Sequence, residues 1–548
     1  MAGIGYWRGI GLCGLAALSF GALANEQTQA QPSGDLGPKW GPHIDFEAKL
    51  GSKRNLGEAD LLLPIAQDAR TLVFSSLRGR FDDNSSLEGN FGLGVRRMLE
   101  SGWNLGAYGY FDRRRSDTGN FFNQGTLGVE ALGRDWDFRA NGYLPIGTRV
   151  RDLGETSSAA LSGAAVQVTS TTREERALKG FDAEMGWRAP LFDSEAARQL
   201  RLYLGGYRFN DDVIKVVGPR VRAELAMEEL PWFGKGTKLF LGAEAQDDSA
   251  RGSQTFLSVR LRIPLGKESS APSTLNAQER RMTAPVMRDV DIVTQSRVSS
   301  TLTEAATQTA GGQTITVLNS ATTTGAALPG AVTGLANGST ILLSGTFNTT
   351  ASVDLTGNKS LIAGNVTVLT PSGRTAVLSS PATISNSNNA LNFIIAAPGN
   401  NTISGLTISG TRAGGSGYGI HINDTAGNVS ILNNTITMTQ TGNNAILGIA
   451  AAQQNQNLTI SGNTVTVVGK AGQTATGLGL LGTTGPASAT VSGNTLNVSG
   501  GGNNYAVWVD NQTTINAGST GNVLVSGTCN GGPTASGSVG FTNGTTCP

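Results

Sequence analysis

Apolar and polar residues alternate along much of the first half of the chain. In residues 180–190, GFDAEMGWRAP, one set of alternate positions is apolar and the other is polar or small. Period-two alternation predicts a β-strand with one apolar and one polar face. The pattern recurs in residues 44–50, 90–96, 126–132, 219–227 and 255–265. In a soluble sheet the apolar face would cover a core, so the pattern alone leaves open whether that face points inward or outward.

Twelve segments of this kind predict twelve strands between residues 40 and 266. They span roughly 44–50, 59–65, 71–81, 87–98, 103–112, 121–132, 136–145, 180–189, 200–209, 214–227, 237–247 and 253–265. Several connections after even-numbered strands are tight, at 68–69, 101–102 and 134–135, and the longest ones, 113–120 and 146–179, follow odd-numbered strands. An even strand number and unequal loops are typical of an outer-membrane β-barrel. Closure also removes the sheet edges that lipid would not tolerate.

If the strands form a membrane barrel, their apolar face points outward to lipid and their polar face points inward to the lumen. The side chains expected to face lipid are Phe181, Ala183, Met185, Trp187, Leu257, Val259 and Leu261. Those expected to face a wet lumen are Asp182, Glu184, Arg188, Arg220, Arg222 and Glu224. Water in the lumen would spare these charges the cost of burial without partners. Trp103, Trp136, Trp187 and Trp232 lie near predicted strand ends, where aromatic girdles occur. The alternative is a soluble β-sandwich with ordinary core aromatics.

A set of motifs in this region stands in a recognisable order. The motifs are LGEADLLLPI (56–65), LVFSSLRGRFDD (72–83), GNFGLGVRRM (89–98), GWNLGAYGYFD (102–112), LGVEAL (127–132) and ANGYLPI (140–146). They resemble the β-domain of the intimin/invasin family, the inverse autotransporters, and the similarity continues into MTAPVMRDVDIV (282–293). The resemblance implies a twelve-stranded barrel, a linker that threads its pore and a C-terminal passenger at the cell surface. In two respects the chain departs from the family, because residues 25–39 are too few for a peptidoglycan-binding module and the passenger does not look like tandem immunoglobulin-like domains.

Residues 326–548 repeat a different pattern about every thirty residues. Segments 401–410, 428–438, 457–467, 488–498 and 520–527 align so that Leu406, Asn434, Asn463, Asn494 and Asn522 hold one turn position, at spacings of 28, 29, 31 and 28 residues. A second apolar strand recurs at 417–422, 445–450, 476–481 and 505–509, and an earlier coil is expected at 360–369, after an entry at 334–347. Short repeated strands predict a solenoid whose rungs bury one another. The repeat resembles right-handed parallel β-helices of the pectate-lyase kind.

The expected fold class is therefore all-β: a 12-stranded transmembrane antiparallel β-barrel followed by a right-handed parallel β-helix. At the N-terminus, Arg8, an apolar run and the small residues Ala22 and Ala24 are typical of a signal peptide. The expected division is a signal peptide (1–24), a short periplasmic segment (25–39), the barrel (40–266), a pore-threading linker (267–325) and the passenger (326–548). Cys529 and Cys547 remain after export, and an even pair predicts a disulfide.

Charge nearly vanishes in the passenger. The whole chain has a formal net charge of +1, which gives no field for nucleic acid. The passenger's acids are Asp354, Asp424 and Asp510, and the last two should lie about 14 Å apart at three rungs. Glycosidase carboxylates cooperate only up to about 9.5 Å. We therefore expect no enzymatic activity, no catalytic residues, no cofactor and no metal.

The favoured hypothesis is an outer-membrane barrel that anchors and displays its own passenger by type V secretion. The passenger would be an adhesin, or a module that binds a surface receptor or glycan, with Tyr418, Tyr505 and Trp508 as candidate ligand contacts. Expected partners are outer-membrane lipid, periplasmic chaperones, the barrel-assembly machinery and an unidentified receptor or glycan. Two alternatives stay open: a surface-displayed polysaccharide lyase or hydrolase, and a porin-like channel with an appended stalk.

Overall fold

The computed structural model describes residues 39–228, 230, 236–265, 275–289, 291–422, 427–451, 456–481, 487–510, 512–532 and 535–548. The chain forms two compact units. One contains residues up to Arg149 and Ala177–Val293, and the other contains Val150–Arg176 and Thr294–Pro548. The predicted signal peptide, nearly all of segment 25–39, Trp232 and Asp424 lie outside the described residues. Among the helices in the described ranges, none is long and apolar enough to cross a membrane.

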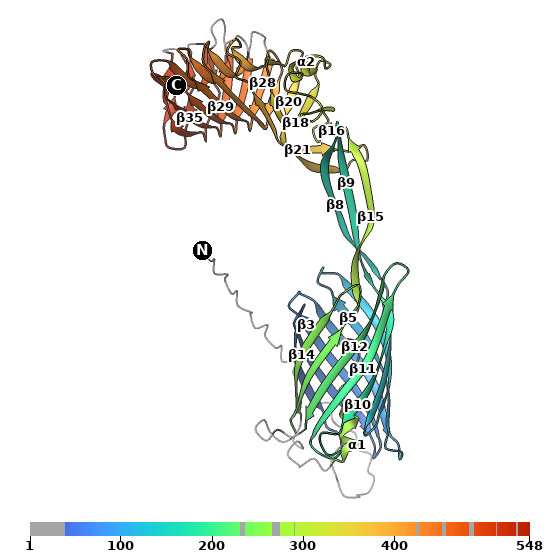
Figure 1. Cartoon of the computed structure of the whole chain (residues 1–548). Coiled ribbons are helices and arrows are strands. Elements are labelled where there is room, and N and C mark those ends of the chain that lie inside the picture. The colour runs from blue at the N-terminus through green and yellow to red at the C-terminus, as the bar shows by residue number, and fades with distance from the viewer. Residues whose placement is uncertain are drawn as a thin grey trace. The chain divides into compact units, whose positions relative to one another are not determined.

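The first unit is a closed barrel of twelve antiparallel strands, as predicted (Figure 1). The strands are β1 (His43–Gly51), β2 (Leu56–Gln67), β3 (Thr71–Asp82), β4 (Leu87–Met98), β5 (Asn104–Arg115), β6 (Phe121–Leu132), β7 (Trp136–Ile146), β10 (Lys179–Ala189), β11 (Arg198–Asn210), β12 (Lys215–Met227), β13 (Lys238–Gln246) and β14 (Gln254–Pro264). β14 pairs with β1, with Ile263 opposite Ile44, and this pairing closes the barrel.

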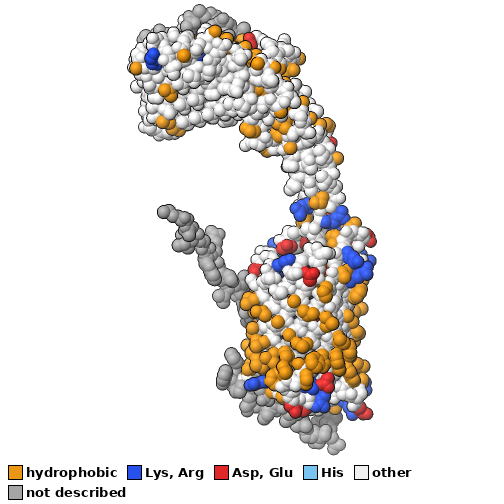
Figure 2. Space-filling model, viewed as in Figure 1, with side chains coloured by type: hydrophobic (Ala, Val, Ile, Leu, Met, Phe, Trp, Pro, Cys, Tyr) orange, Lys and Arg blue, Asp and Glu red, His pale blue; other side chains and the backbone are white. Residues whose placement is uncertain are grey.

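The barrel is apolar on its outer face and charged on its inner face. Phe181, Leu257 and Val259 are 56%, 65% and 51% exposed, and hydrophobic side chains gather over the barrel surface (Figure 2). Ala183, Met185, Trp187 and Leu261 share that outer face. Asp182, Glu184, Arg220 and Arg222 are buried inside, whereas Arg188 and Glu224 are half-buried. The alternation therefore has its apolar side outward, which a lipid environment stabilises.

The long connection expected at 146–179 contains two further strands that the alternation did not predict. β8 (Val150–Ser162) and β9 (Ala165–Ala177) form a hairpin, and β15 (Thr294–Ala306) joins it in the order β15-β9-β8. The connection expected at 113–120 is shorter, because β5 extends to Arg115. The difference in loop length between the two ends of the barrel is therefore due mostly to this one hairpin.

The second unit contains a parallel β-solenoid with three sheets. The first sheet consists of β17 (Ile315–Asn319), β18 (Thr340–Asn348), β20 (Ser360–Ile362), β25 (Thr402–Ser404), β28 (Gly427–Leu432), β31 (Gln456–Ser461), β34 (Ala487–Ser492) and β37 (Thr513–Ile515). The second continues from β18 through β23 (Ala382–Ser385), β26 (Leu406–Arg412), β29 (Thr435–Gln440), β32 (Thr464–Val468), β35 (Thr495–Ser499) and β38 (Val523–Ser526). The third consists of β19 (Val353–Asp354), β24 (Phe393–Ala396), β27 (Gly417–Ile422), β30 (Ile446–Ala451), β33 (Thr474–Leu480), β36 (Asn503–Val509) and β39 (Thr528–Gly531).

Several short elements lie outside this regular pattern. The coil expected at 360–369 is only half right, because β20 belongs to the solenoid but β21 (Gly364–Leu369) leaves it. β21 pairs antiparallel with β22 (Thr375–Ser380) and β16 (Gln308–Thr309). The remaining elements are α1 (Ala277–Arg280), a 3₁₀ turn (Arg281–Thr283), α2 (Leu328–Thr333), β40 (Val539–Gly540) and β41 (Thr546–Cys547).

The predicted turn positions form a buried asparagine ladder. The backbone N–H of Asn434 donates to Oδ1 of Asn463 at 2.9 Å, and the same bond recurs from Asn463 to Asn494 and from Asn494 to Asn522. Each of these asparagines follows a residue with positive φ, which is Asn433, Gly462, Gly493 or Gly521. That left-handed conformation favours Gly and Asn, which explains the repeated dipeptide at each turn. The ladder satisfies polar groups that the apolar core would otherwise leave unpaired.

Candidate functional site

Residues 275–289 and 291–293 pass through the barrel lumen, and we call them the thread. At one end, Nε2 of Gln278 donates to the carbonyl of Leu99 at 3.0 Å, and Nδ2 of Asn104 donates to the carbonyl of Gln278 at 2.8 Å. Leu99 belongs to the turn between β4 and β5. The thread therefore enters at the end of the barrel that carries the turns after even-numbered strands.

The thread leaves at the opposite end. Asp291 forms ion pairs with Arg54 at 2.7 Å, in the connection between β1 and β2, and with Arg114 at 3.2 Å. The backbone N–H of Leu178 donates to the carbonyl of Val293 at 2.9 Å, close to the base of the β8–β9 hairpin. In outer-membrane barrels the short turns are periplasmic and the longer loops are extracellular. The thread thus runs from the periplasmic end to the extracellular end.

Inward-pointing arginines hold the thread by its backbone. Arg96 donates to the carbonyls of Met282 at 2.9 Å and Ala284 at 2.7 Å. Two other strands contribute in the same way, Arg78 to the carbonyl of Val286 at 3.1 Å and Arg262 to that of Thr283 at 2.6 Å. Every residue has a backbone carbonyl, so these contacts do not depend on which side chain passes. Sequence reasoning missed this role, although the arginines occupy polar positions of the alternation.

Ion pairs and the thread fill much of the lumen, which differs from the wet lumen expected. Glu184 accepts from Arg139 at 2.8 Å and from Arg222 at 3.0 Å. Asp182 accepts from the hydroxyl of Tyr143 at 2.7 Å and lies 3.5 Å from Arg220. Arg222 also pairs with Glu224 at 3.1 Å. The charges are therefore stabilised by protein partners, which buried charges require.

The remaining predicted lumen residue lies at the rim. Arg188 pairs with Asp135 at 2.6 Å, in the tight turn between β6 and β7. Near this end, a cavity of about 430 Å³ remains beside the thread. Its lining includes Arg139, Arg201 and Lys238 together with Glu224 and Glu195. The lining contains more Arg and Lys side chains than Glu side chains, so an ion entering the cavity would meet a predominantly basic surface.

Comparison with known proteins identifies the barrel. Residues 21–272 match the family model described as inverse autotransporter, beta-domain. The barrel is an inverse autotransporter β-domain. This confirms the resemblance found in the sequence and the outer-membrane location, and the β-solenoid that follows is the passenger, exposed at the cell surface.

Several solved structures are similar to this chain at low sequence identity. A chain from a study of in-meso crystallization of membrane proteins is 17% identical, covers 46% of this chain and 100% of its own, and has a TM-score of 0.33. The β-domain of the Bordetella autotransporter BrkA is 12% identical, with coverages of 41% and 99% and a TM-score of 0.24. The translocator domain of NalP from Neisseria meningitidis is 10% identical, with coverages of 42% and 90% and a TM-score of 0.24. The comparison with curated proteins found no match.

The three predicted ligand contacts of the passenger lie on the outer face of the third sheet. Tyr418 and Tyr505 occupy one column of the sheet, and His421 and Trp508 occupy the next. The rings of Tyr418 and His421 stack at 5.2 Å, and those of Tyr505 and Trp508 lie 5.6 Å apart. The sequence alone did not single out Phe393, whose ring stacks on that of His421 at 5.4 Å.

The two aromatic groups flank a floor of smaller side chains. They are three rungs apart, or about 14 Å at the usual strand spacing. Between them lie Leu447, Ala450 and Thr476, all of which are buried. Because these three side chains are buried, the half-buried rings at the two ends are the groups that a ligand could contact on this face.

The described acids of the passenger accept hydrogen bonds from backbone N–H groups in neighbouring turns. Oδ1 of Asp354 accepts from the backbone N–H of Thr356 at 2.9 Å. Oδ1 of Asp510 accepts from the backbone N–H groups of Gln512 and Thr513, both at 3.1 Å. Five rungs of the third sheet separate these acids, or about 24 Å. This exceeds the reach of about 9.5 Å for paired glycosidase carboxylates.

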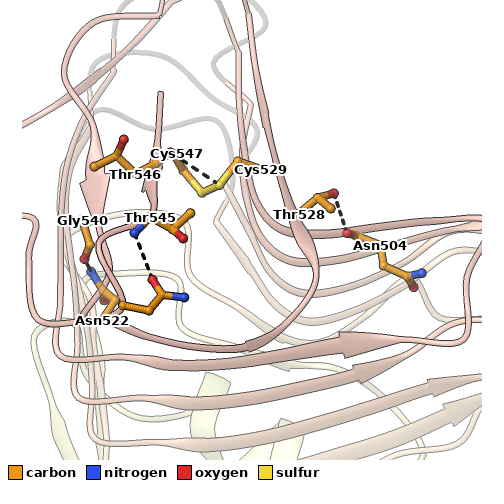
Figure 3. Close-up of a disulfide and its surroundings, with 9 residues drawn as sticks. Asn504, Asn522, Thr528, Cys529, Gly540, Thr545, Thr546 and Cys547 are labelled. Atoms are coloured by element: carbon orange, nitrogen blue, oxygen red, sulfur yellow. Dashed lines mark hydrogen bonds between the residues drawn. A yellow bond between two sulfur atoms is a disulfide. The ribbon is translucent and has the colours of Figure 1, made fainter.

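A disulfide joins Cys529 of β39 to Cys547 of β41 at the C-terminal end of the solenoid (Figure 3). Nearby, Nδ2 of Asn522 donates to the carbonyl of Gly540 at 3.1 Å, and the hydroxyl of Thr528 donates to the carbonyl of Asn504 at 3.0 Å (Figure 3). These contacts tie the final segment to the last rungs. Closing an open solenoid end in this way protects the terminal rung from fraying.

Proposed function

We propose that the protein is an adhesin. The barrel anchors the chain, type V secretion brings the passenger to the surface, and the outer face of the third sheet binds a receptor or a surface glycan. The observation that carries this proposal is the pair of aromatic groups around Tyr418 and Tyr505. Aromatic side chains dominate the energetics of many interfaces.

A neutral glycan is the ligand class that the surroundings favour. The apolar C–H face of a sugar ring stacks on aromatic rings, and its hydroxyl groups suit uncharged polar neighbours. The neighbouring second sheet presents a column of threonines in register, namely Thr346, Thr383, Thr407, Thr435, Thr464 and Thr495. These threonines are uncharged, and the exposed Lys470 between β32 and β33 adds a single positive charge, so the attraction for an acidic polymer should be weak.

The binding experiment uses the full-length protein in detergent micelles and a panel of host-type glycans, polygalacturonate and alginate. The double variant Tyr505→Ala/Trp508→Ala should weaken glycan binding about tenfold or more, because both ring faces are lost. Thr459→Ala, at an exposed position of β31 in the first sheet, should bind like the parent and serves as the control. Equal binding by the double variant would contradict the proposal. Release of reducing or unsaturated sugar ends would instead favour the lyase or hydrolase alternative.

The orientation of the chain is tested on whole cells. An epitope tag after Pro548 should be stained on unpermeabilised cells, because the thread runs toward the extracellular end. A tag directly after Ala24 should be stained only after permeabilisation. The reverse pattern would contradict inverse orientation.

The porin alternative is tested by conductance. In planar bilayers the parent should conduct much less than a variant that lacks residues 275–293, because the thread obstructs the lumen. Equal conductance of the two proteins would favour the porin-like channel.

A further inference from the structure

The β8–β9 hairpin belongs to the barrel by sequence but to the passenger by packing. The chain leaves the barrel after β7 and returns at β10, and the intervening residues Val150–Arg176 cluster with the passenger unit. β8 and β9 pair over their whole length and are joined by a two-residue turn at 163–164. A barrel loop therefore forms part of the passenger's structure.

The first strand beyond the thread adds to the edge of this hairpin. The thread ends at Val293, and β15 begins at Thr294 and lies next to β9. The hydroxyl of Ser299 donates to the carbonyl of Thr172 at 3.2 Å, and the hydroxyls of Thr169 and Thr303 lie 3.1 Å apart. An exposed strand edge is a ready partner for an extended chain. The edge strand β9 therefore pairs with β15, the first segment that follows the thread.

The apolar face of the hairpin covers the first rungs of the solenoid. Val166 and Val168 are almost fully buried in one apolar cluster with Val317, Leu342 and Leu378, and β8 packs beside β22. This cluster is separate from the main core of the solenoid. Arg374, in the turn between β21 and β22, also pairs with Glu155 of β8 at 2.9 Å, although this exposed pair adds little.

The register of the first sheet shows that the first rungs carry apolar side chains on their outer face, where later rungs carry mostly polar ones. One outward column begins with Val317, Leu342 and Ile362, and continues with Ser404, Leu432, Ser461 and Ser492. The covered rungs are apolar at this position, and three of the four later rungs carry serine. An exposed apolar column would favour aggregation, so a cover is required while the passenger folds.

We propose that the β8–β9 hairpin is a folding template for the passenger. β15 adds to β9, the first rungs condense on Val166 and Val168, and the remaining rungs then propagate along the solenoid. A solenoid folds by nucleation followed by addition of repeats, so a preformed first layer lowers the initial entropic cost. The inference is independent of which ligand the passenger binds.

The test follows pulse-labelled full-length chain in growing cells. Val168→Lys places a charge on the covered face, and Gln167→Lys, one residue away on the opposite face, is the matched control. Heat-modifiable migration reports barrel assembly, and protease resistance of the surface passenger reports its folding. We expect Val168→Lys to delay passenger folding about tenfold or more with the barrel assembled normally, and Gln167→Lys to match the parent.

A second measurement separates a template from a contact made late. The unfolding rate of the displayed passenger is measured by protease digestion after transfer of the cells to urea. If more than about half of the stability change falls on the folding rate, the hairpin acts in the transition state and the proposal holds. If most of it falls on the unfolding rate, or if neither rate changes, the proposal is overturned. Should Val168→Lys prevent folding altogether, Val168→Ala provides the same comparison at lower severity.

Discussion

The barrel and the solenoid are both built from alternating strands, yet they bury opposite faces. In the barrel, Phe181 and Leu257 point outward and Glu184 lies inside. In the solenoid, Ile431 and Val465 are fully buried and threonines such as Thr407 point outward. The alternation is the same because it follows from the pleat. The surrounding medium, lipid or water, decides which face is stable outside.

The two interiors also solve the problem of buried polar groups differently. The lumen pairs carboxylates with arginines, as in Glu184 with Arg139 and Arg222. The solenoid uses uncharged amides, which form the ladder from Asn434 to Asn522. The difference follows the composition of the two regions, because the barrel strands are rich in charged residues and the solenoid is rich in Asn, Ser and Thr.

The largest effect is expected from breaking a lumen ion pair. Glu184→Ala leaves Arg139 and Arg222 without their shared carboxylate and should cost the barrel about 3–5 kcal/mol. Glu100→Ala removes an exposed pair with Arg70 and should cost about 0–1 kcal/mol. Denaturant unfolding of the protein in micelles measures both. Equal costs would mean that the lumen is as well solvated as the outer surface.

A charge on the lipid face should have the next largest effect. Met185→Arg places a guanidinium in the middle of β10 and should cost about 2–4 kcal/mol in a bilayer, because hydrocarbon does not solvate it. Leu191→Arg, in the connection 190–197, should cost about 0–1 kcal/mol. Unfolding in liposomes compares the two variants. Tolerance of Met185→Arg would contradict the outward direction of the apolar face.

Breaking the asparagine ladder should have a smaller effect. Asn463→Ala leaves the backbone N–H of Asn434 and the carbonyl of Ile431 without partners and should cost the passenger about 1–3 kcal/mol. Asn497→Ala removes a half-buried amide that accepts from Ser526 at 2.6 Å, and should cost about 0.5–1.5 kcal/mol. The urea dependence of protease resistance on cells provides the comparison. A larger loss for Asn497→Ala would refute the ladder's role.

The smallest effect is expected on the open face of the solenoid. Thr407→Val changes an exposed hydroxyl to a methyl group and should alter stability by less than about 0.5 kcal/mol. The same urea assay applies. A loss comparable to that of Asn463→Ala would show that the threonine column contributes to the fold itself.

Much of the barrel could be predicted because its pattern is local. Each of the twelve strands carries its own alternation, so the count and approximate bounds follow from short segments. Partner choice is not local. Arg262 pairs with Asp45, 217 residues away, and only the closure of β14 on β1 brings them together. The arginine contacts with the thread depend on that same closure.

The β8–β9 hairpin shows the opposite case. Its segment is rich in Ser, Thr, Ala and charged residues, and Val166 and Val168 alone give a weak apolar pattern. The residues that bury them, such as Leu342 and Leu378, lie far along the chain. No local pattern could therefore indicate that a barrel loop would pack with the passenger.

The sequence by itself determined the strand alternation, the repeat near thirty residues and the turn asparagines. These features recur at short intervals along the chain, because side chains alternate along a strand and each turn of the solenoid repeats the last. It also indicated the Cys529–Cys547 pair, which the structure joins. The tertiary structure alone decided how the lumen charges pair, how the thread is held and where the hairpin packs. These features depend on contacts between residues far apart in the chain, and such contacts exist only once the sheets have closed and stacked.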